Sequence, residues 1–307
     1  MSAKRIASLL PSATEIVCAL GCGSQLVMRS HECDYPATAR DVPVCTQSRI
    51  NADEPSAGID QSVKTAAAAG QPLFAIDART LREARPDLIL TQAHCEVCAV
   101  SIEDLTDIIR SWPGPEPEVV PLSPTRFAHL WDDMKRVAAA IGLPDDGKEQ
   151  ISDYKLRCVN VIERAALPTR KPSVLALEWL DPLMAGGNWI PDMIEMTGAV
   201  NLIAKAGEHS GWITMEQITA ADPDVIVLLP CGFDLARTLK EAELLEQLPG
   251  WRQLKAVKKK RVYATDGSSF FNRPGPRLVD SLEILGEMFY PGMIEFGHER
   301  VHWKPVY

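Results

Sequence analysis

The sequence predicts an α/β fold with two similarly built halves, and three observations support this. Short apolar runs bounded by turn residues alternate with stretches of helical periodicity, which is typical of α/β proteins. The unit Arg-Pro-Asp-Leu-Ile-Leu at 85–90 is matched by Asp-Pro-Asp-Val-Ile-Val at 222–227, a weak internal repeat. Between them, residues 145–167 carry apolar side chains at helical spacing throughout.

The elements are expected in this order. Residues 5–10 read as a short buried strand that Pro11 ends. Ser12 then caps a helix that stops at Gly21, with Glu15 completing a capping box. Further strands are expected at 87–91, 172–178, 225–230 and 262–265. Further helices are expected at 102–112, 127–141, 145–167, 190–197, 235–245 and 277–289.

Composition limits the function classes. The chain has 307 residues, of which 46% are hydrophobic and 24% charged, as in a soluble globular protein with room for two domains. A net charge of -9 disfavours nucleic acid and anionic membranes as partners. No stretch is long enough for a membrane span. Eight cysteines without an export signal before the first strand suggest reduced thiols and a cytoplasmic protein, or a periplasmic one if the start has been trimmed.

Several segments carry a family resemblance, in the same order along the chain. They are residues 5–15 (Arg-Ile-Ala-Ser-Leu-Leu-Pro-Ser-Ala-Thr-Glu), 27–36 (ending Asp-Tyr-Pro), 81–90, 214–228 and 268–277 (Ser-Ser-Phe-Phe-Asn-Arg-Pro-Gly-Pro-Arg). Together they resemble the substrate-binding proteins of ABC importers for cobalamin and iron-siderophores. The resemblance implies two Rossmann-like lobes joined by a long rigid helix, with the ligand cleft between the lobes. The expected divisions are residues 1–125, connecting helices at 126–170, and residues 171–307.

The resemblance also suggests which side chains contact the ligand. Phe270 and Phe271 occupy the place of an aromatic pair in cobalamin-binding relatives, and Arg273 suits a carboxylate or phosphate. Broad aromatic faces stack well on a flat macrocycle, although the tryptophans could equally pack the core. The expected ligand-binding residues are Ser12, Glu32, Glu178, Trp179, Trp189, Trp212, Phe270, Phe271 and Arg273.

Four cysteines follow predicted strands, where ligands bind in open α/β sheets. They are Cys33, Cys95, Cys98 and Cys231. His31 and His94 lie nearby in the sequence and could replace a thiolate as a metal ligand or bond to the ligands from behind. Four thiolates suit zinc or an iron–sulfur cluster, and a thiolate or imidazole could also ligate a corrinoid cobalt. Buried core cysteines and a redox-active Cys-x-x-Cys pair are the alternatives.

The leading hypothesis is therefore a non-catalytic ligand-binding protein for a cobalamin-like corrinoid or an iron complex, with a thiolate metal site. The alternative is an iron–sulfur or zinc protein with a redox or enzymatic role. The resemblance also implies docking on an ABC permease through Glu216, with Glu96 or Glu103 as the counterpart in the first lobe.

Overall fold

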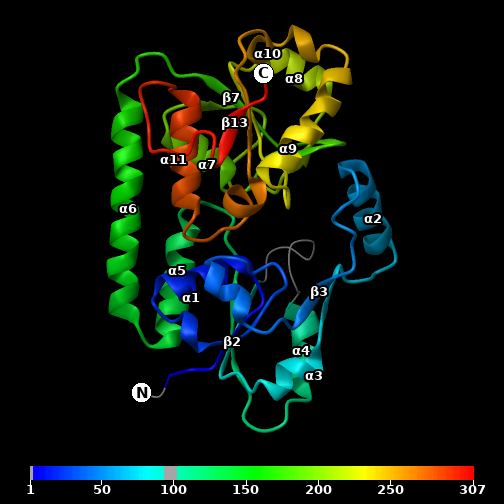
Figure 1. Ribbon diagram of the computed structural model, residues 1–307, viewed down its shortest axis with the longest axis vertical. Helices are drawn as coiled ribbons and strands as arrows, with labels where there is room; N and C mark the ends of the chain where they lie inside the picture. The colour runs from blue at the N-terminus through cyan, green and yellow to red at the C-terminus, as the bar shows by residue number, and fades with distance from the viewer. Residues whose placement is uncertain (1–2, 93–101) are drawn as a thin grey trace. The chain divides into compact units, whose positions relative to one another are not determined.

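The computed structural model describes residues 3–92 and 102–307 (Figure 1). By their contacts the residues fall into two compact units. The N-terminal unit comprises Met1–Asp53, Gln61–Pro124 and Ala128–Asp153. The C-terminal unit comprises Glu54–Asp60, Thr125–Phe127 and Tyr154–Tyr307. Neither unit is one continuous stretch of chain.

The N-terminal unit is built on a parallel sheet with strand order β2-β1-β5-β6. Its strands are β1 (Ile6–Ser8), β2 (Leu26–Arg29), β5 (Leu88–Gln92) and β6 (Glu118–Leu122). A separate antiparallel pair is formed by β3 (Thr46–Ser48) and β4 (Phe74–Ile76). The helices are α1 (Pro11–Ala19), α3 (Ala78–Glu83), α4 (Ile102–Arg110) and α5 (His129–Ile141). Buried Leu9, Leu81 and Ile89 form part of its core.

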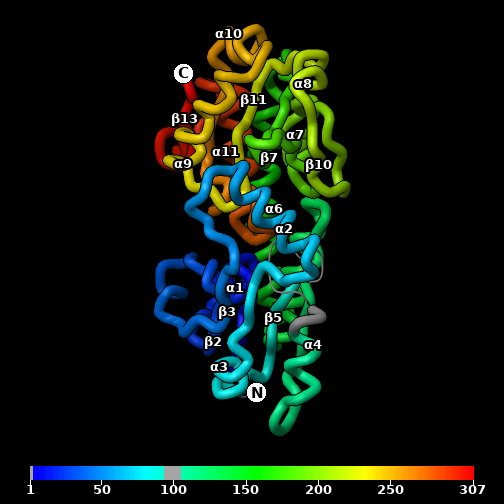
Figure 2. The backbone as a smooth tube through the Cα atoms, turned by 90° about the vertical axis from the view of Figure 1, so that its right-hand side faces the viewer, coloured from blue at the N-terminus to red at the C-terminus, as the bar shows by residue number. Residues whose placement is uncertain are grey.

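The C-terminal unit contains a mixed sheet with strand order β10-β8-β7-β11-β12-β13, and β9 pairs with β7. Its strands are β7 (Ser173–Leu180), β8 (Leu183–Ala185), β9 (Val200–Asn201), β10 (Gly211–Trp212), β11 (Val225–Leu228), β12 (Val262–Thr265) and β13 (Trp303–Pro305). The central strands β7, β11 and β12 are parallel, and β7 and β11 lie side by side in Figure 2. The strands expected at 172–178, 225–230 and 262–265 are therefore present.

Helices cover this sheet. They are α7 (Ile190–Met196), α8 (Met215–Ala221), α9 (Leu235–Glu241), α10 (Lys255–Lys258) and α11 (Leu278–Phe289). The core beneath them is closed by Leu175, Ile226 and Trp251, all essentially without solvent exposure. Burying such side chains contributes about 1.5–3 kcal/mol each to folding.

Two helices pass from one unit to the other along the chain. Helix α6 (Pro144–Ala166) has 23 residues, so the predicted long helix is confirmed, and it is about 35 Å long. Its residues from Tyr154 onward belong to the C-terminal unit. Helix α2 (Ser56–Ala68) begins in the C-terminal unit and continues in the N-terminal unit.

The short segments 54–60 and 125–127 are held in the C-terminal unit by specific bonds. Ser56 Oγ donates to Glu241 Oε2 at 2.8 Å, and Arg237 donates to the Glu54 carbonyl. Arg126 forms a bidentate ion pair with Asp192, with its Nε 2.8 Å from one carboxylate oxygen and its Nη2 2.6 Å from the other. These contacts make the two segments integral parts of the unit.

The predicted capping box at the first helix is wrong. Helix α1 begins at Pro11, its N-cap is Leu10, and no side chain caps it. Proline has a fixed φ and lacks an N–H, both of which suit the first helical position, so the helix starts before Ser12 can act as the cap. Ser12 and Glu15 are instead buried within the first turns. A capping box does occur at α8, where Thr214 and Gln217 bond reciprocally.

Helix α5 buries a carboxylate. Asp133 is almost fully buried, its Oδ2 has no hydrogen-bond partner, and Arg136 lies 3.3 Å from its other oxygen. Burial is the main cause that raises the pKa of Asp133 to about 6. The ionised side chain is therefore an internal destabilising element at neutral pH.

We expect the Asp133→Asn variant to be more stable than the parent protein above pH 6, by up to about 3 kcal/mol. The folded state holds the proton more tightly than the unfolded state, whose pKa is near 3.8. The destabilisation is thus absent below about pH 4, grows as the pH rises and is complete above the folded pKa. Urea unfolding from pH 4 to pH 8 measures the difference.

Asp132→Asn is the matched control, because Asp132 is an exposed neighbour paired with Lys135. If the gain in free energy of unfolding in Asp133→Asn did not change with pH, or if Asp132→Asn gained as much, the raised pKa of Asp133 could not be its cause.

Candidate functional site

The C-terminal unit gathers chemically versatile residues at the carboxyl ends of its parallel strands. Because β7, β11 and β12 run in the same direction, the residues that follow them emerge at one edge of the sheet. Those residues are Glu178 and Trp179 at the end of β7, Cys231 to Phe233 after β11, and Gly267–Phe271 after β12. Ligands of open α/β sheets bind outside this edge.

Glu178 is fixed in place by a loop that the sequence analysis missed. Ser210 Oγ donates to Glu178 Oε2 at 2.8 Å and accepts from the Gly187 N–H at 2.9 Å. A Cβ on Gly187 would lie 2.5 Å from the Ser210 nitrogen, so only glycine allows this approach. The Gly186-Gly187 pair was the available sequence signal. Glu178 is thus a half-buried carboxylate with a fixed orientation.

The three expected tryptophans have different environments. Trp179 and Trp189 are buried, and their indole N–H groups donate to the carbonyls of Asp181 at 3.0 Å and Phe271 at 2.8 Å. Both therefore pack the core. Trp212 is 51% exposed on β10, where it pairs with Met184, which pairs in turn with Trp179 on β7. Only the last of the three presents a broad indole face to solvent.

The segment after β12 forms a π-helical turn, Gly267–Phe271, that encloses its aromatic pair. Phe271 is completely buried, and Phe270 packs its ring 4.6 Å from that of His302. The two rings are thus largely enclosed by protein here, and stacking on a ligand stays a prediction for them. Arg273 is half-buried, and its Nη2 lies 3.5 Å from Ser268 Oγ.

In the N-terminal unit, the last residue of β1 and residues that follow β1 and β2 form a buried polar cluster. Thr14 Oγ1 lies 2.8 Å from Ser8 Oγ and 3.0 Å from Cys33 Sγ, and all three residues are buried. His31 Nδ1 lies 2.7 Å from Thr46 Oγ1. Burial lowers the pKa of His31, helped by the charge of Arg29, so its imidazole is neutral at pH 7.

The other expected contacts of this unit differ in exposure. Ser12 is buried in α1, whereas Glu32 is exposed directly after β2. Of the two, only the glutamate can reach a ligand without rearrangement of its surroundings.

Only some of the residues of the predicted thiolate site are among the residues that the structure describes. Cys95, Cys98 and His94 lie outside the described residues, as does the docking candidate Glu96, and the structure gives no side-chain information for Glu103. Cys33 is buried and Cys231 is exposed after β11. Within residues 3–92 and 105–307, neither cysteine belongs to a group of three potential metal ligands. A four-thiolate centre therefore stays a prediction.

One such group does occur on α11 and the following loop, formed by Asp280, Glu283 and His298. Arg157 already supplies a cation there, because its Nη2 lies 2.5 Å from Asp280 Oδ1 and 2.7 Å from Glu283 Oε2. His298 Nε2 is 3.0 Å from the same glutamate oxygen. This cluster is an internal ion-pair network that joins α6 to α11.

Known proteins share both sequence and fold with the chain. A family model described as periplasmic binding protein matches residues 6–268. An uncharacterized ABC transporter substrate-binding lipoprotein of Bacillus subtilis is 25% identical over 293 residues, covering 94% of this chain and 80% of the relative. A vitamin B12-binding protein of Vibrio cholerae is 22% identical over 298 residues, with coverages of 92% and 87%.

Solved structures of periplasmic binding proteins have a similar fold. A possible iron-binding (periplasmic solute-binding) protein from Staphylococcus epidermidis superimposes with a TM-score of 0.71 at 21% identity, covering 94% of this chain and all of that one. The periplasmic vitamin B12 binding protein of Vibrio cholerae gives 0.66 at 20% identity, with coverages of 94% and 96%. At these identities the structures show a common fold. Within the described residues, every helix is too short or too polar to cross a membrane.

We expect Ser210→Ala to lower the free energy of unfolding by about 1–2 kcal/mol, because it leaves the Gly187 N–H and one Glu178 oxygen without this partner. Ser152→Ala, on the exposed surface of α6, is the control and should change stability little. Chemical denaturation measures both. Equal stability of the two variants would show that the Ser210 bonds do not fix the loop.

Proposed function

The chain belongs to the periplasmic binding protein family, which confirms the resemblance seen in the sequence, and from this premise we propose that it binds a cobalamin-like corrinoid. Vitamin B12-binding proteins recur among its curated relatives. The observation that carries the proposal is the exposed ring of Trp212 on β10, the outermost strand of the sheet. Trp212 pairs with Met184 on β8, and Met184 pairs in turn with Trp179 on β7. A flat macrocycle offers a large apolar face to such a surface.

The expected contacts can be ranked by exposure. Trp212 and Glu32 are exposed, and Glu178 and Arg273 are half-buried, so these four can touch a ligand directly. The remaining predicted contacts are buried, and they would support these four residues rather than touch the ligand. They are Ser12, Trp179, Trp189, Phe270 and Phe271. A ligand position between the two lobes stays a prediction from the resemblance.

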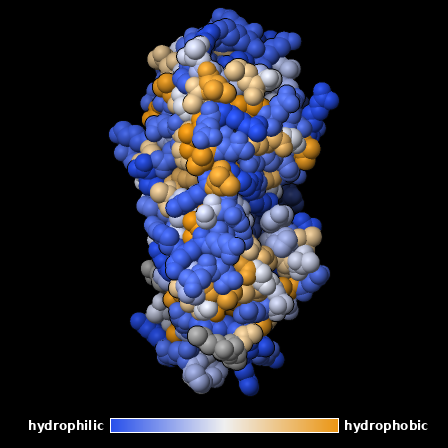
Figure 3. Space-filling view, turned by 90° about the vertical axis from the view of Figure 1, so that its left-hand side faces the viewer, coloured by the Kyte–Doolittle hydropathy of each residue, from blue (hydrophilic) through white to orange (hydrophobic). Residues whose placement is uncertain are grey.

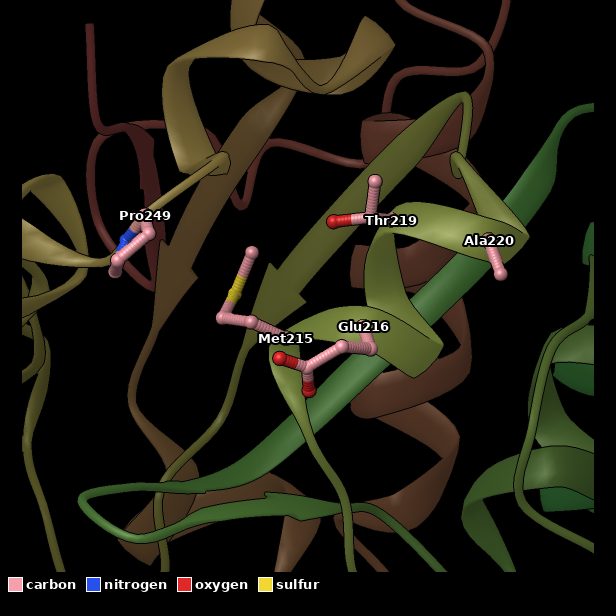
Figure 4. Close-up of a pocket in the computed structure, with 5 residues that line it drawn as sticks. All are labelled: Met215, Glu216, Thr219, Ala220 and Pro249. Carbon is pink, nitrogen blue, oxygen red and sulfur yellow. The ribbon is translucent and has the colours of Figure 1, made fainter.

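We also propose that Glu216 contributes to docking on an ABC permease. It lies in the first turn of α8, at an open hollow of about 350 Å³ lined by Met215, Glu216, Thr219, Ala220 and Pro249 (Figure 4). Figure 4 shows its carboxylate extending from the helix surface. A hydrogen bond with the Thr214 side chain lowers the pKa of Glu216, so the group stays charged for an arginine partner.

The names of the relatives, which include a lipoprotein and periplasmic binding proteins, support an exported location for this chain as well. The cytoplasmic location expected from the sequence receives no support from them.

We expect cyanocobalamin to bind with micromolar or tighter affinity in a tryptophan-fluorescence titration. Trp212→Ala should weaken binding about 2- to 12-fold, because an aromatic contact contributes about 0.5–1.5 kcal/mol. Met293→Ala is the control, since Met293 is also exposed and apolar but lies after α11. A flat titration would overturn the corrinoid proposal, and tighter binding of hemin than of cyanocobalamin would redirect it to haem.

The absorption spectrum and metal content of protein purified without oxygen separate the corrinoid from the thiolate alternative. We expect corrinoid bands and cobalt, unchanged in a Cys95→Ser, Cys98→Ser double variant. Broad visible absorption with iron and sulfide, lost in that variant, would instead establish a cluster on these cysteines.

A further inference from the structure

Strand β7 contains one charged residue in an otherwise buried stretch. Within residues 174–180 only Glu178 is not buried, and the others pack as expected for a strand in the middle of a sheet. The pairing of β7 with β8 shifts between Leu177 and Trp179, so Glu178 is the extra residue of a β-bulge. Bulges redirect side chains and are common next to binding sites. Core packing therefore does not account for a carboxylate at this position.

The Glu178 side chain is held rigidly at the carboxyl edge of the sheet. Ser210 Oγ donates to its Oε2, and the Gly187 N–H donates to Ser210 Oγ in turn. On the β11 side of β7, the Cys231 N–H donates to the Glu178 carbonyl at 3.2 Å. An ionised carboxylate accepts hydrogen bonds and donates none. Because the group is held in place, a ligand part next to it must supply a donor or lose affinity.

Exposed apolar surface alone does not select a ligand on this molecule. Figure 3 shows the side on which α6 lies in Figure 1, and apolar side chains are scattered there among polar ones. The exposed ring of Trp212 is one of several exposed apolar side chains, which include Val200 and Met293. Apolar contact provides affinity, whereas a small number of fixed polar groups provides specificity. At the carboxyl edge of the sheet, Glu178 is such a group.

The periphery of a flat metal-binding macrocycle decides whether it can meet this carboxylate. A corrin ring carries mainly carboxamides, whose N–H groups donate, whereas a porphyrin of the haem type carries carboxylates, which only accept and bring like charge. We propose that Glu178 is a specificity-determining residue that selects a macrocycle with peripheral carboxamides against one with peripheral carboxylates. This inference rests on the corrinoid function proposed above. Arg273, after β12, would attract an anion instead, so rejection of a carboxylate at this edge depends on Glu178.

Cyanocobalamin and its monocarboxylic acids, in each of which one peripheral carboxamide is hydrolysed, test this by fluorescence titration of the full chain. Each acid differs from cyanocobalamin in a single group of the periphery. We expect at least one of the acids to bind the parent protein about tenfold or more weakly than cyanocobalamin, because its carboxylate lies next to Glu178. Glu178→Gln should reduce that difference to about threefold or less, since the new amide can both accept and donate. Its affinity for cyanocobalamin should change little.

Glu243→Gln is the matched control, because Glu243 is an exposed carboxylate after α9, and it should leave the discrimination unchanged. Ser210→Ala should lower the discrimination, because it frees the Glu178 side chain to move. Equal binding of cyanocobalamin and all the acids by the parent protein would overturn this inference and leave the corrinoid function standing. Discrimination that survives Glu178→Gln, or Ser210→Ala should the first variant not fold, would do the same. A flat titration with cyanocobalamin itself would overturn both.

Discussion

Parallel pairing of β7, β11 and β12 is the constraint on which the candidate site depends. Strands that run in the same direction must deliver their following residues to one edge, whatever those residues are. The register brings Glu178, Cys231 and the turn at Gly267–Phe271 to that edge from segments far apart in the sequence. The short antiparallel strands β8 and β10 then extend the sheet and add Trp212.

Helix α11 is the second organising element. Glu287 Oε1 accepts from the N–H groups of Phe296, Gly297 and His298, and its Oε2 accepts from the Trp303 indole at 2.7 Å. One turn earlier, Glu283 accepts from Arg157 and lies beside His298. A buried carboxylate with this many donors is well compensated for its desolvation. The same helix therefore fixes the C-terminal loop and the part of α6 that belongs to the C-terminal unit.

Sequence patterns predicted those features that arise locally. Periodicity was sufficient for α6 and for the apolar strands, because both follow from regular spacing of side chains. It failed at Ser12, where the fixed φ of Pro11 started the helix two residues earlier, with Leu10 as the N-cap. It could not distinguish Trp212 from Trp179, because exposure depends on which strand pairs with which. Spacing likewise indicated that the cysteines could meet, but burial of Cys33 beside Thr14 is a tertiary property.

The division of the chain has a consequence for how such a protein can be cut and recombined. Segments 54–60 and 125–127 belong to the C-terminal unit, although the chain on either side of each belongs to the N-terminal unit. A fragment that begins at Tyr154 would lack the Arg126 partner of Asp192 and the Ser56 partner of Glu241. No single crossover between two genes can then exchange one unit intact. An exchange of the C-terminal unit must therefore carry segments 54–60 and 125–127 along with Tyr154–Tyr307.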